Sequence, residues 1–496
     1  MNTLLLLTPL AAPLLAAALY AAFGWRRATA HADTAAAALI LAAGIALAVR
    51  VMRHGSIDLL GGWLRADPLA AFMLMGIGTI ALLAAATSPA YLAAAHGPDA
   101  EPGQITAAAN RRYGALVACF LAAMSAGALA GNLGLAWIAI EATTIVTAFL
   151  VGHTGTRAAV EAAWKYTVIC SVGIALALLG IIVLYAAARH AGLSESAALD
   201  FRTLAAHAHA LDPAVTRMAT ALMILGFGAK AGLAPLHAWL PDAHSQAPAP
   251  VSALMSGVLL PVAFIQILRV KTIADDALGA GFTRALLLTM GLSALALAAL
   301  LLIAQRDYKR MLAYSTMEHM GLVTVGAAIG SRLAMAAVFL HIAGHGLAKA
   351  VAFITSGHIQ HAEHTTRIDQ VKALAARQPV VAGIFAAALL ALLGFPPFSL
   401  FASELALARA GFAAGLGWPV AAAFTLILIA LAALVTHTAA MLLGNPEGGG
   451  RPAASDALNL TARTPLITAL VAVGALGISA WPISSLIATA AQGGAR

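Results

Sequence analysis

Apolar stretches of about twenty residues follow one another along almost the whole of this 496-residue chain. A helix needs about that many apolar residues to cross the hydrocarbon core of a bilayer. Only 10% of the residues are charged, whereas soluble globular proteins carry about 25%. The chain is therefore predicted to be an all-α polytopic membrane protein.

We expect about fourteen membrane-spanning helices. They are predicted near residues 3–22, 34–52, 67–89, 113–130, 132–152, 164–187, 214–240, 249–270, 282–303, 310–330, 332–357, 378–404, 415–443 and 463–488. Arg26 and Arg27 follow the first span instead of preceding it, which favours an N-terminus outside the cell. An even number of spans then places both termini on that outer side.

The connections between the spans are short, apart from 90–112, 188–213 and 444–462. The last of these is rich in glycine and proline and is predicted to be a flexible linker. None has room for a soluble domain, so the chemistry must lie in the membrane or on a partner.

The sequence offers no ligand set for a redox or nucleotide cofactor. Cys119 and Cys170 both lie inside apolar stretches, and the chain contains neither a C-x-x-C nor a G-x-x-x-x-G-K-[ST] motif. We therefore expect no cofactor and no metal on this chain. The net charge of +8 indicates cationic loops on the cytoplasmic face of a membrane protein, not a nucleic-acid partner.

A lone lysine lies beside a predicted helix break in the stretch 225–257. Lys230 ends an apolar run, with Gly228 just before it and Pro235 just after it. Proline removes a backbone donor and interrupts a helix, and lipid tolerates the break only where protein or water satisfies the freed carbonyls. An unpaired charge at such a break indicates a functional site. The alternative is a lysine that extends to the membrane surface.

A second predicted break lies at 394–401, with Pro396 and Pro397, and is followed by Glu404. Two breaks with ionisable residues, five spans apart, fit an inverted repeat of helices 4–8 and 9–13 in which helices 7 and 12 are broken. The expected organisation is N-terminal helices 1–112, a first repeat 113–270, a second repeat 282–443, and a linker with a last helix, 444–496.

Two further charged residues lie within apolar stretches. Glu141 has no charged residue within six positions, and such a carboxylate in hydrocarbon either protonates or finds a cation. A protonated Glu141 bonded to backbone is the alternative. Lys165 follows Glu161 by four positions, the favourable order for a helical ion pair, so an interfacial salt bridge remains open for it.

Histidines gather in the tenth and eleventh predicted spans. His341, His345 and Lys349 share one helical face, and a histidine, with a pKa of about 6.5, can donate and accept a proton in turn. Glu318 and His319 lie about two turns inside the preceding span. A zinc site would need a further acidic ligand at this depth. The cluster of His358, His361 and His364 is interpreted as a solvated helix end, with weak metal binding as the alternative.

Several of these segments resemble one family. The runs PLHAWLPDAH, 235–244, and PAPVSAL, 248–254, which follow Lys230, resemble the loop between helices seven and eight of the antiporter-like subunits of respiratory complex I, Mrp-type sodium/proton antiporters and membrane-bound hydrogenases. The run DYKRMLAYST, 307–316, and the H-x-x-x-K-A-x-x-F pattern from His345 to Phe353 resemble helices ten and eleven of that family. Within the family, 160–180 most resembles hydrogenase-4 component F.

The resemblance implies a non-redox subunit that moves protons along buried Glu, Lys and His side chains, in a line across the middle of the bundle. It pairs Glu141 with Lys230 and places Lys165 near that pair. The implied path comprises Glu141, Lys165, Lys230, His237, His244, Glu318, His319, His341, His345, Lys349 and Glu404. The Glu318–His319 pair departs from the small or amide residues that are frequent in the family.

The implied partners are other membrane subunits of a hydrogenase- or complex I-like assembly and, through them, a peripheral nickel–iron and iron–sulfur arm. Protons are the expected ion, with sodium as the alternative, and membrane lipids surround the chain in a bacterial inner membrane with both termini periplasmic. Two other functions stay open, an Mrp-type sodium/proton antiporter subunit and an energy-coupled ion or inorganic-carbon uptake subunit. A scaffold without ion flux is a further alternative.

Overall fold

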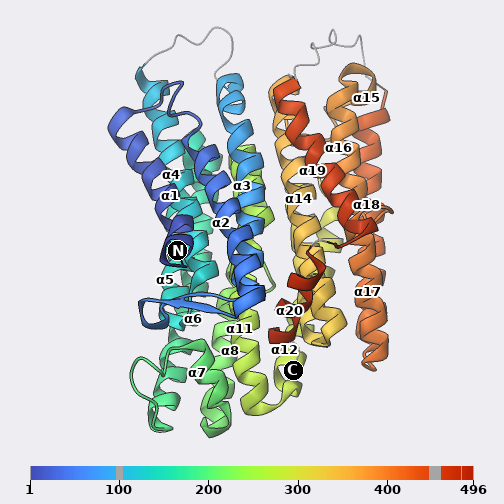
Figure 1. Ribbon diagram of the computed structural model, residues 1–496. Coiled ribbons are helices and arrows are strands. Elements are labelled where there is room, and N and C mark those ends of the chain that lie inside the picture. Colours follow the sequence, from blue (N-terminus) through green and yellow to red (C-terminus); the bar gives the residue numbers. More distant parts are fainter. Residues whose placement is uncertain (1, 96–103, 446–459, 482, 495–496) are drawn as a thin grey trace.

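The computed structural model describes residues 2–95, 104–445, 460–481 and 483–494, and it forms a bundle of long helices (Figure 1). Ten helices in these ranges are long and apolar enough to cross a membrane. The prediction of an all-α polytopic membrane protein is thereby confirmed.

The N-terminal part contains three long helices and a small hairpin. Its elements are α1 (Asn2–Phe23), α2 (Ala32–His54), β1 (Ile57–Leu59), η1 (Leu60–Gly62), β2 (Leu64–Ala66) and α3 (Pro68–Ala95). The antiparallel hairpin sets Asp58 opposite Arg65, and the two side chains form an ion pair at 2.6 Å. Its turn uses Gly61 and Gly62 at φ values of 64° and 92°, which glycine adopts without steric cost.

The middle of the chain supplies the first of the two broken segments. Its elements are α4 (Gln104–Leu129), α5 (Leu133–Val151), η2 (Gly152–Thr154), α6 (Arg157–His190), α7 (Phe201–Ala206), η3 (Ala208–Ala210), α8 (Pro213–Lys230), α9 (Trp239–Gln246), α10 (Ala249–Leu254), the π-helical turn η4 (Met255–Leu259) and α11 (Leu260–Leu278). The last three elements form one continuous helical stretch, Ala249–Leu278, whose apolar window is completely buried.

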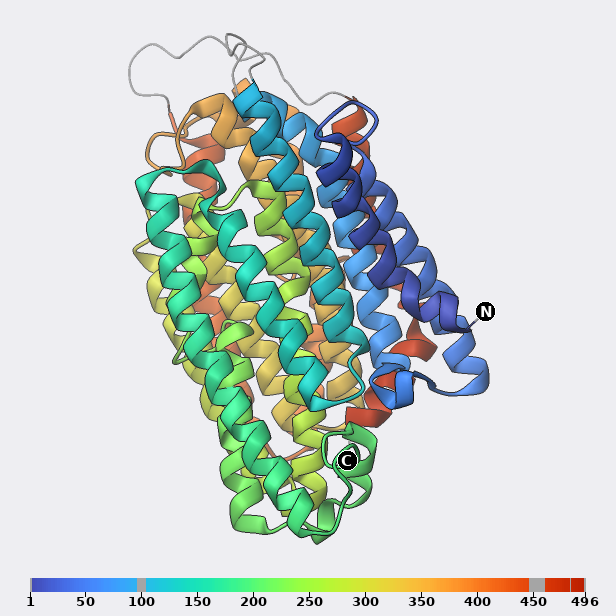
Figure 2. The same cartoon turned by 90° about the vertical axis from the view of Figure 1, so that its left-hand side faces the viewer.

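The remainder contains the second broken segment. Its elements are α12 (Ala280–Ile303), α13 (Tyr308–Ile329), α14 (Arg332–Glu363), α15 (Leu374–Arg377), α16 (Pro379–Leu392), α17 (Ser399–Ala413), α18 (Gly417–Leu443), α19 (Leu460–Ile478) and α20 (Ser484–Gly494). In Figure 1, α1 to α6 lie on one side and α14 to α19 on the other. Figure 2 shows the blue α1 and α2 on the opposite flank from the teal α6.

Short polar side chains fix where many helices begin. Each accepts a hydrogen bond from the amide three residues later, which satisfies one of the free N–H groups of the first turn. These caps are Asn132 on α5, Thr156 on α6, Asp212 on α8, Asp307 on α13 and Ser331 on α14.

Small residues let α6 and α8 pack with their backbones close together. A Cβ added to Gly226 would lie 2.5 Å from the backbone nitrogen of Ala177, and one added to Gly173 would lie 2.5 Å from the Cβ of Ala229. Such contacts are typical of membrane helices, where packing takes the place of the hydrophobic effect. The close approach brings Tyr166 of α6 to the end of α8, where Lys230 lies.

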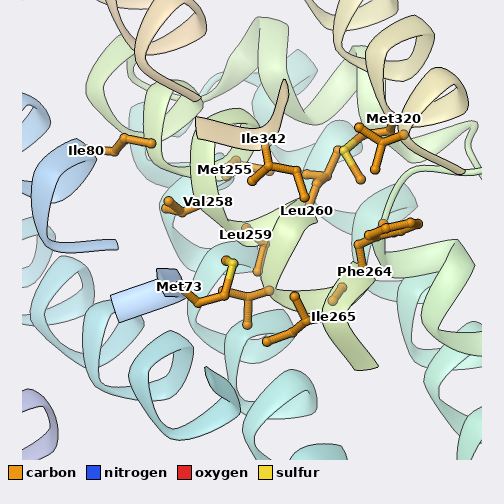
Figure 3. Packing of buried hydrophobic residues seen from close by; sticks show 14 of the residues in the cluster. Met73, Ile80, Met255, Val258, Leu259, Leu260, Phe264, Ile265, Met320 and Ile342 are labelled. Atoms are coloured by element: carbon orange, nitrogen blue, oxygen red, sulfur yellow. The ribbon is translucent and has the colours of Figure 1, made fainter. Parts of the chain in front are cut away.

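The core of the bundle surrounds the stretch from η4 to α11. Figure 3 shows Met255, Leu259 and Phe264 of this stretch packed among side chains of α3, α13 and α14. Apolar packing at this depth leaves few places for charge, and each buried ionisable group therefore requires its own account.

Both predicted breaks are present. The chain leaves the helix between α8 and α9, where Pro235 lies, and between α16 and α17, where Pro396 and Pro397 lie. Gly228 does not break the helix, because α8 continues through it to Lys230. Proline removes a backbone donor, whereas glycine leaves the helical hydrogen bonds intact.

Other details of the expected organisation differ. The four predicted spans beyond the ten long helices correspond to α8–α9, α13, α16–α17 and α19, which are broken, shorter or more polar, so the structure does not by itself establish fourteen spans. The predicted connection 188–213 contains α7 and η3, and most of the predicted linker 444–462 lies outside the described residues.

Candidate functional site

The first polar group surrounds Lys230, the last residue of α8, whose side chain is fully buried. Its Nζ donates to Thr144 Oγ1 at 2.9 Å and to the hydroxyl of Tyr166. The break that follows leaves helical carbonyls free, and Trp239 Nε1 donates to one of them, that of Ala229, at 2.9 Å. Side-chain donors of this kind make a helix break tolerable in lipid.

Glu141 lies one helical turn before Thr144 on α5 and is half-buried. Its Oε1 accepts a hydrogen bond from Ser171 at 3.4 Å. No ion pair joins Glu141 to Lys230, both of which lie in described residues. The implied pair thus makes no direct contact, and Thr144, one turn from Glu141, bonds to Lys230 instead.

Lys165 lies outside the buried group, although Tyr166 follows it directly in the sequence. Its side chain is 48% exposed on the outer face of α6 and forms ion pairs with Glu161 at 2.7 Å and Asp242 at 3.1 Å. Asp242 in turn pairs with Arg310. The resemblance placed Lys165 near the pair of Glu141 and Lys230, and the structure contains the surface salt bridge with Glu161 that had remained open for it.

The second polar group is a hydrogen-bonded chain of histidines. His319 Nδ1 lies 3.1 Å from His341 Nε2, and His341 Nδ1 lies 2.9 Å from Ser403 Oγ. Ser403 Oγ donates to the carbonyl of Leu400 at 2.8 Å, so it accepts from His341. For neutral rings this fixes both tautomers, with the Nδ1–H of His341 donating to Ser403 and the Nδ1–H of His319 donating to His341.

Two acceptor sites at this cluster stay open among the described residues. Neither His319 Nε2 nor His345 Nε2 has a hydrogen-bond partner there, and the two ring centroids are 4.9 Å apart. A proton can be received at either nitrogen without breaking an existing bond. No group of three or more His, Cys, Asp or Glu side chains in the described ranges is arranged to hold a metal ion.

Lys349 is fully buried one turn from His345 on α14. Its Nζ donates to the backbone carbonyl of Leu312 at 2.8 Å. Glu318 on α13 is 5% exposed and forms no ion pair with Lys349 in the described part of the chain. Lys349 resembles Lys230, since each is a buried lysine whose Nζ donates to neutral oxygens.

The two histidines predicted from the loop after Lys230 occupy different environments. The ring of His244 is completely buried, has no hydrogen-bond partner in the described ranges, and stacks on Phe353 with a centroid distance of 5.3 Å. Phe353 lies one turn beyond Lys349 on α14, so His244 adjoins the second group. His237 is half-buried in the break and makes no hydrogen bond to another predicted residue of the path.

Lys309, in the run DYKRMLAYST, is a buried cation that the predicted path does not include. Its side chain is 1% exposed, and its Nζ donates to the carbonyl of Ala247 at 2.9 Å and to Gln360 Oε1 at 3.4 Å. No carboxylate pairs with it among the described residues. A signal was available, because Lys309 shares one helical face with Thr316 and His319.

The polar groups of the second half follow the axis of α14. One face of α14 carries His341, His345, Lys349, Phe353 and Gln360. Phe353 contacts His244, and Gln360 accepts a hydrogen bond from Lys309. From His341 to Gln360 the helix rises about 28 Å, close to the roughly 30 Å hydrocarbon core. A line across the middle of the bundle was expected, and in this half the buried polar side chains follow one another along the helix axis.

Glu404 lies next to Ser403 on α17 and is half-buried. Its carboxylate contacts the break before α17, where a Cβ added to Gly394 would overlap it. Gly394 adopts a φ of 65°, so glycine is favoured there both by the backbone and by the available space. In the cluster of His358, His361 and His364, the ring of His361 lies against Tyr91 with a centroid distance of 4.5 Å and an interplanar angle of 31°.

A buried lysine at a broken helix, a second buried lysine within α14 and a histidine chain between neighbouring helices are typical of polytopic membrane proteins that translocate ions. The transmembrane family described as NADH:quinone oxidoreductase/Mrp antiporter matches residues 130–430, and the chain belongs to it. It is an antiporter-like subunit of the hydrogenase-4, complex I and Mrp family.

Individual relatives agree with this assignment. The hydrogenase-4 component F homolog of Methylacidiphilum infernorum is 35% identical over 397 residues, which is 79% of this chain and 81% of the relative. A chain of the membrane-bound sulfane sulfur reductase, an archaeal respiratory membrane complex, has the same fold at a TM-score of 0.85 and 23% identity, over 99% of this chain and 97% of that one. A chain of the Mrp complex from Dietzia sp. matches with the same TM-score and coverage at 22% identity.

Proposed function

We propose that this chain translocates protons as a non-redox membrane subunit of a hydrogenase-4- or complex I-like oxidoreductase complex. The observation that carries the proposal is the column of buried proton carriers along α14, which extends over about the thickness of the hydrocarbon core. Each carrier is held by neutral groups, and lysine, unlike arginine, can release its proton when it is buried. Electron transfer would take place in partner subunits with a peripheral nickel–iron and iron–sulfur arm.

The histidine chain supplies a specific transfer step. A proton that arrives at Nε2 of His319 allows its Nδ1 proton to pass to Nε2 of His341. His341 would then release its own Nδ1 proton to Ser403 only as Ser403 gives up its hydroxyl proton, which would turn from the carbonyl of Leu400 to the carboxylate of Glu404. Each ring is neutral before and after the step, and the tautomers must be restored before the next proton.

Entry to this chain is assigned to the opposite end of α14. Lys309 lies at the level of Gln360, and Lys349 lies between that level and His345. His244 lies between Lys309 and Lys349. Its ring stacks on Phe353, one turn beyond Lys349, and its helix α9 ends just before Ala247, whose carbonyl accepts from Lys309. The order Lys309, His244, Lys349, His345 and His319 follows from these contacts.

The first group has the chemistry of a switch. Lys230 is the proton carrier, and Glu141 is the charge that sets whether Lys230 holds its proton. Glu141 is only half-buried, so a neighbouring membrane subunit could reach it. Two inverted repeats, 113–270 and 282–443, would then each carry one lysine centre, in a bacterial inner membrane with both termini periplasmic.

The test is redox-driven proton movement in vesicles that contain the intact complex, with and without sodium. The proposal expects acidification or alkalinisation that persists in sodium-free buffer and is lost in the Lys349→Met variant. Transport that requires sodium would instead support the Mrp-type sodium/proton antiporter function. An unchanged proton flux in Lys349→Met would remove the column along α14 from the path.

A further inference from the structure

Three cavities follow one another along α3, outside the polar groups described above. The first, about 210 Å³, is lined by Arg65, Arg202 and Arg269 at the level of the hairpin. The second, about 150 Å³, shares Arg269 and Asp67 with the first. The third, about 230 Å³, lies deeper between α3, η4, α14 and α19. The first two share lining residues, and Phe339 of the second contacts Phe72 of the third; we call this series of cavities, polar at one end and apolar along the rest, the groove.

The polar end presents more positive than negative charge to the groove. Arg65 is held by Asp58 at 2.6 Å and Asp200 at 2.8 Å, but neither carboxylate lines the cavity. Burial opposes ionisation of Asp200, yet hydrogen bonds from Thr203 and Arg65 outweigh it and lower the pKa of this carboxyl. The pair of Arg65 and Asp200 therefore stays charged at neutral pH.

The two other arginines have donors to spare. Arg202 is 59% exposed and makes a single bond, to Asp58 at 3.2 Å. Arg269 donates to the carbonyls of Ala130 and Ala128, and Asp67, the one carboxylate among the lining residues, lies 3.5 Å from it. A guanidinium has five N–H donors in a planar fork that matches phosphate oxygens. The polar end is therefore suited to a phosphate group.

The apolar end is suited to a hydrocarbon chain. Phe339 lines the second cavity and Phe72 lines the third, and their rings contact each other at a centroid distance of 5.4 Å. In the third cavity the hydroxyl of Thr79 is bonded to its own helix, and the walls include Ile80, Val258 and Ile342, which Figure 3 shows. No charged side chain lines this cavity within the described residues.

The dimensions fit a membrane lipid. From Asp67 to Ile80 the helix α3 rises about 20 Å, and one leaflet contributes about 15 Å of hydrocarbon, half of the bilayer core. Met75, Thr79 and Leu476 are half-buried, so the third cavity is accessible from the flank of the bundle. A phosphate at the arginines would thus place an acyl chain in the two deeper cavities.

We propose that this groove binds one anionic phospholipid. Its phosphate lies between Arg202 and Arg269, and one acyl chain follows α3 past Phe72 into the cavity beside η4. The excess of guanidinium groups over carboxylates in the lining favours a headgroup of net negative charge. Such a lipid joins α3 to α14, α19 and α20, and it thereby links the N-terminal helices to the C-terminal ones.

Two variants test the headgroup site and the acyl-chain site of the groove separately. Arg202→Ala removes the most accessible guanidinium, and because that side chain is exposed, the fold is expected to persist. Gly76→Leu fills the third cavity, since a Cβ at Gly76 meets open space. Gly383→Leu is the matched control, because Gly383 of α16 also has open space around it and does not line the groove.

The experiment is native mass spectrometry of the delipidated complex titrated with phosphatidylglycerol, phosphatidylethanolamine or inorganic phosphate. One phosphatidylglycerol per chain is expected to bind the parent and Gly383→Leu alike. Loss of charged hydrogen bonds should weaken binding about tenfold or more in Arg202→Ala, and Gly76→Leu should weaken it similarly.

Equal phosphatidylglycerol binding by the parent and Arg202→Ala would overturn the proposal. Equal affinity for phosphatidylethanolamine would overturn the anionic headgroup, and displacement of the lipid by inorganic phosphate at similar concentration would indicate a free-phosphate site. Because the measurement is lipid binding, its outcome is independent of whether the chain moves protons.

Discussion

Lys230→Arg tests whether the buried lysine of α8 carries protons or serves only as a fixed charge. The free side chains of arginine and lysine differ in pKa by at least about two units, so arginine holds its proton at least about a hundredfold more firmly. The hydroxyls of Thr144 and Tyr166 can accept bonds from either cation. We therefore expect the arginine variant to assemble and to move protons at about 1% of the parent rate or less.

Assembly should survive because the effects on folding are small and partly opposed. The larger guanidinium in this packed site costs about 1–3 kcal/mol. A second substitution, Lys230→Met, has opposed effects on folding. Removal of a desolvated ammonium is favourable, but the hydroxyls of Thr144 and Tyr166 each lose a hydrogen-bond donor at about 1–3 kcal/mol. Native gels and the retained redox activity of the complex report assembly.

The assay is redox-driven pH change inside sealed vesicles, read with a pH-sensitive dye. Lys165→Arg is the matched control, because Lys165 lies on the neighbouring helix but is exposed and ion-paired. It should pump like the parent. If Lys230→Arg also pumps within a few-fold of the parent, Lys230 is an anchor, and the first polar group does not lie on the proton path.

Three further variants test the second polar group in the same vesicles. His341→Gln can still bond to Ser403 but cannot relay a proton, and it should slow proton flow about a hundredfold, the ordinary worth of a positioned acid–base group; parental flux would exclude the histidine chain. Lys309→Met should reduce flux while assembly is retained on native gels, whereas flux equal to the parent would show that protons enter elsewhere. Gly394→Ala forces a Cβ into the Glu404 carboxylate at a φ of 65° and costs about 1 kcal/mol in thermal stability. Its proton flux should match that of Glu404→Gln. A flux equal to the parent would show that Glu404 does not lie on the path.

The fold was predictable from the sequence where the physics is local. The apolar length required to cross a bilayer and the missing donor of proline act within one helix, and they identify the breaks at Pro235, Pro396 and Pro397 without tertiary information. The hairpin 57–66 was not predicted, because strands of three residues carry too short an alternation to be distinguished from a loop.

The exposure of individual charges was less predictable. Lys165 and Lys309 both belong to helices that also carry other charged residues, yet one is 48% exposed and the other 1%. The difference depends on how each helix is rotated against its neighbours; Glu161, one turn before Lys165, indicated the exposed position of Lys165, whereas no carboxylate one turn from Lys309 in the sequence distinguished its burial. The histidine chain was foreseen as a face of α14, but its partner His319 lies on α13, and contacts between helices do not follow from spacing along one of them.

The two lysine centres are separated by the most apolar part of the bundle. Met255 and Leu260 lie in the fully buried stretch between α8 and α13 (Figure 3). The hydroxyl of Ser256 on η4 is hydrogen-bonded to that of Thr316 on α13 at 2.7 Å. Among the residues that the structure describes, no hydrogen-bonded series of titratable side chains leads from Lys230 to Lys349 through this stretch. Charge is weakly screened in such surroundings, so protonation of one lysine can alter the free energy of protonating the other without any proton passing between them. Under the proposed function, coupling of this kind would let the two centres work in turn, each moving its own proton.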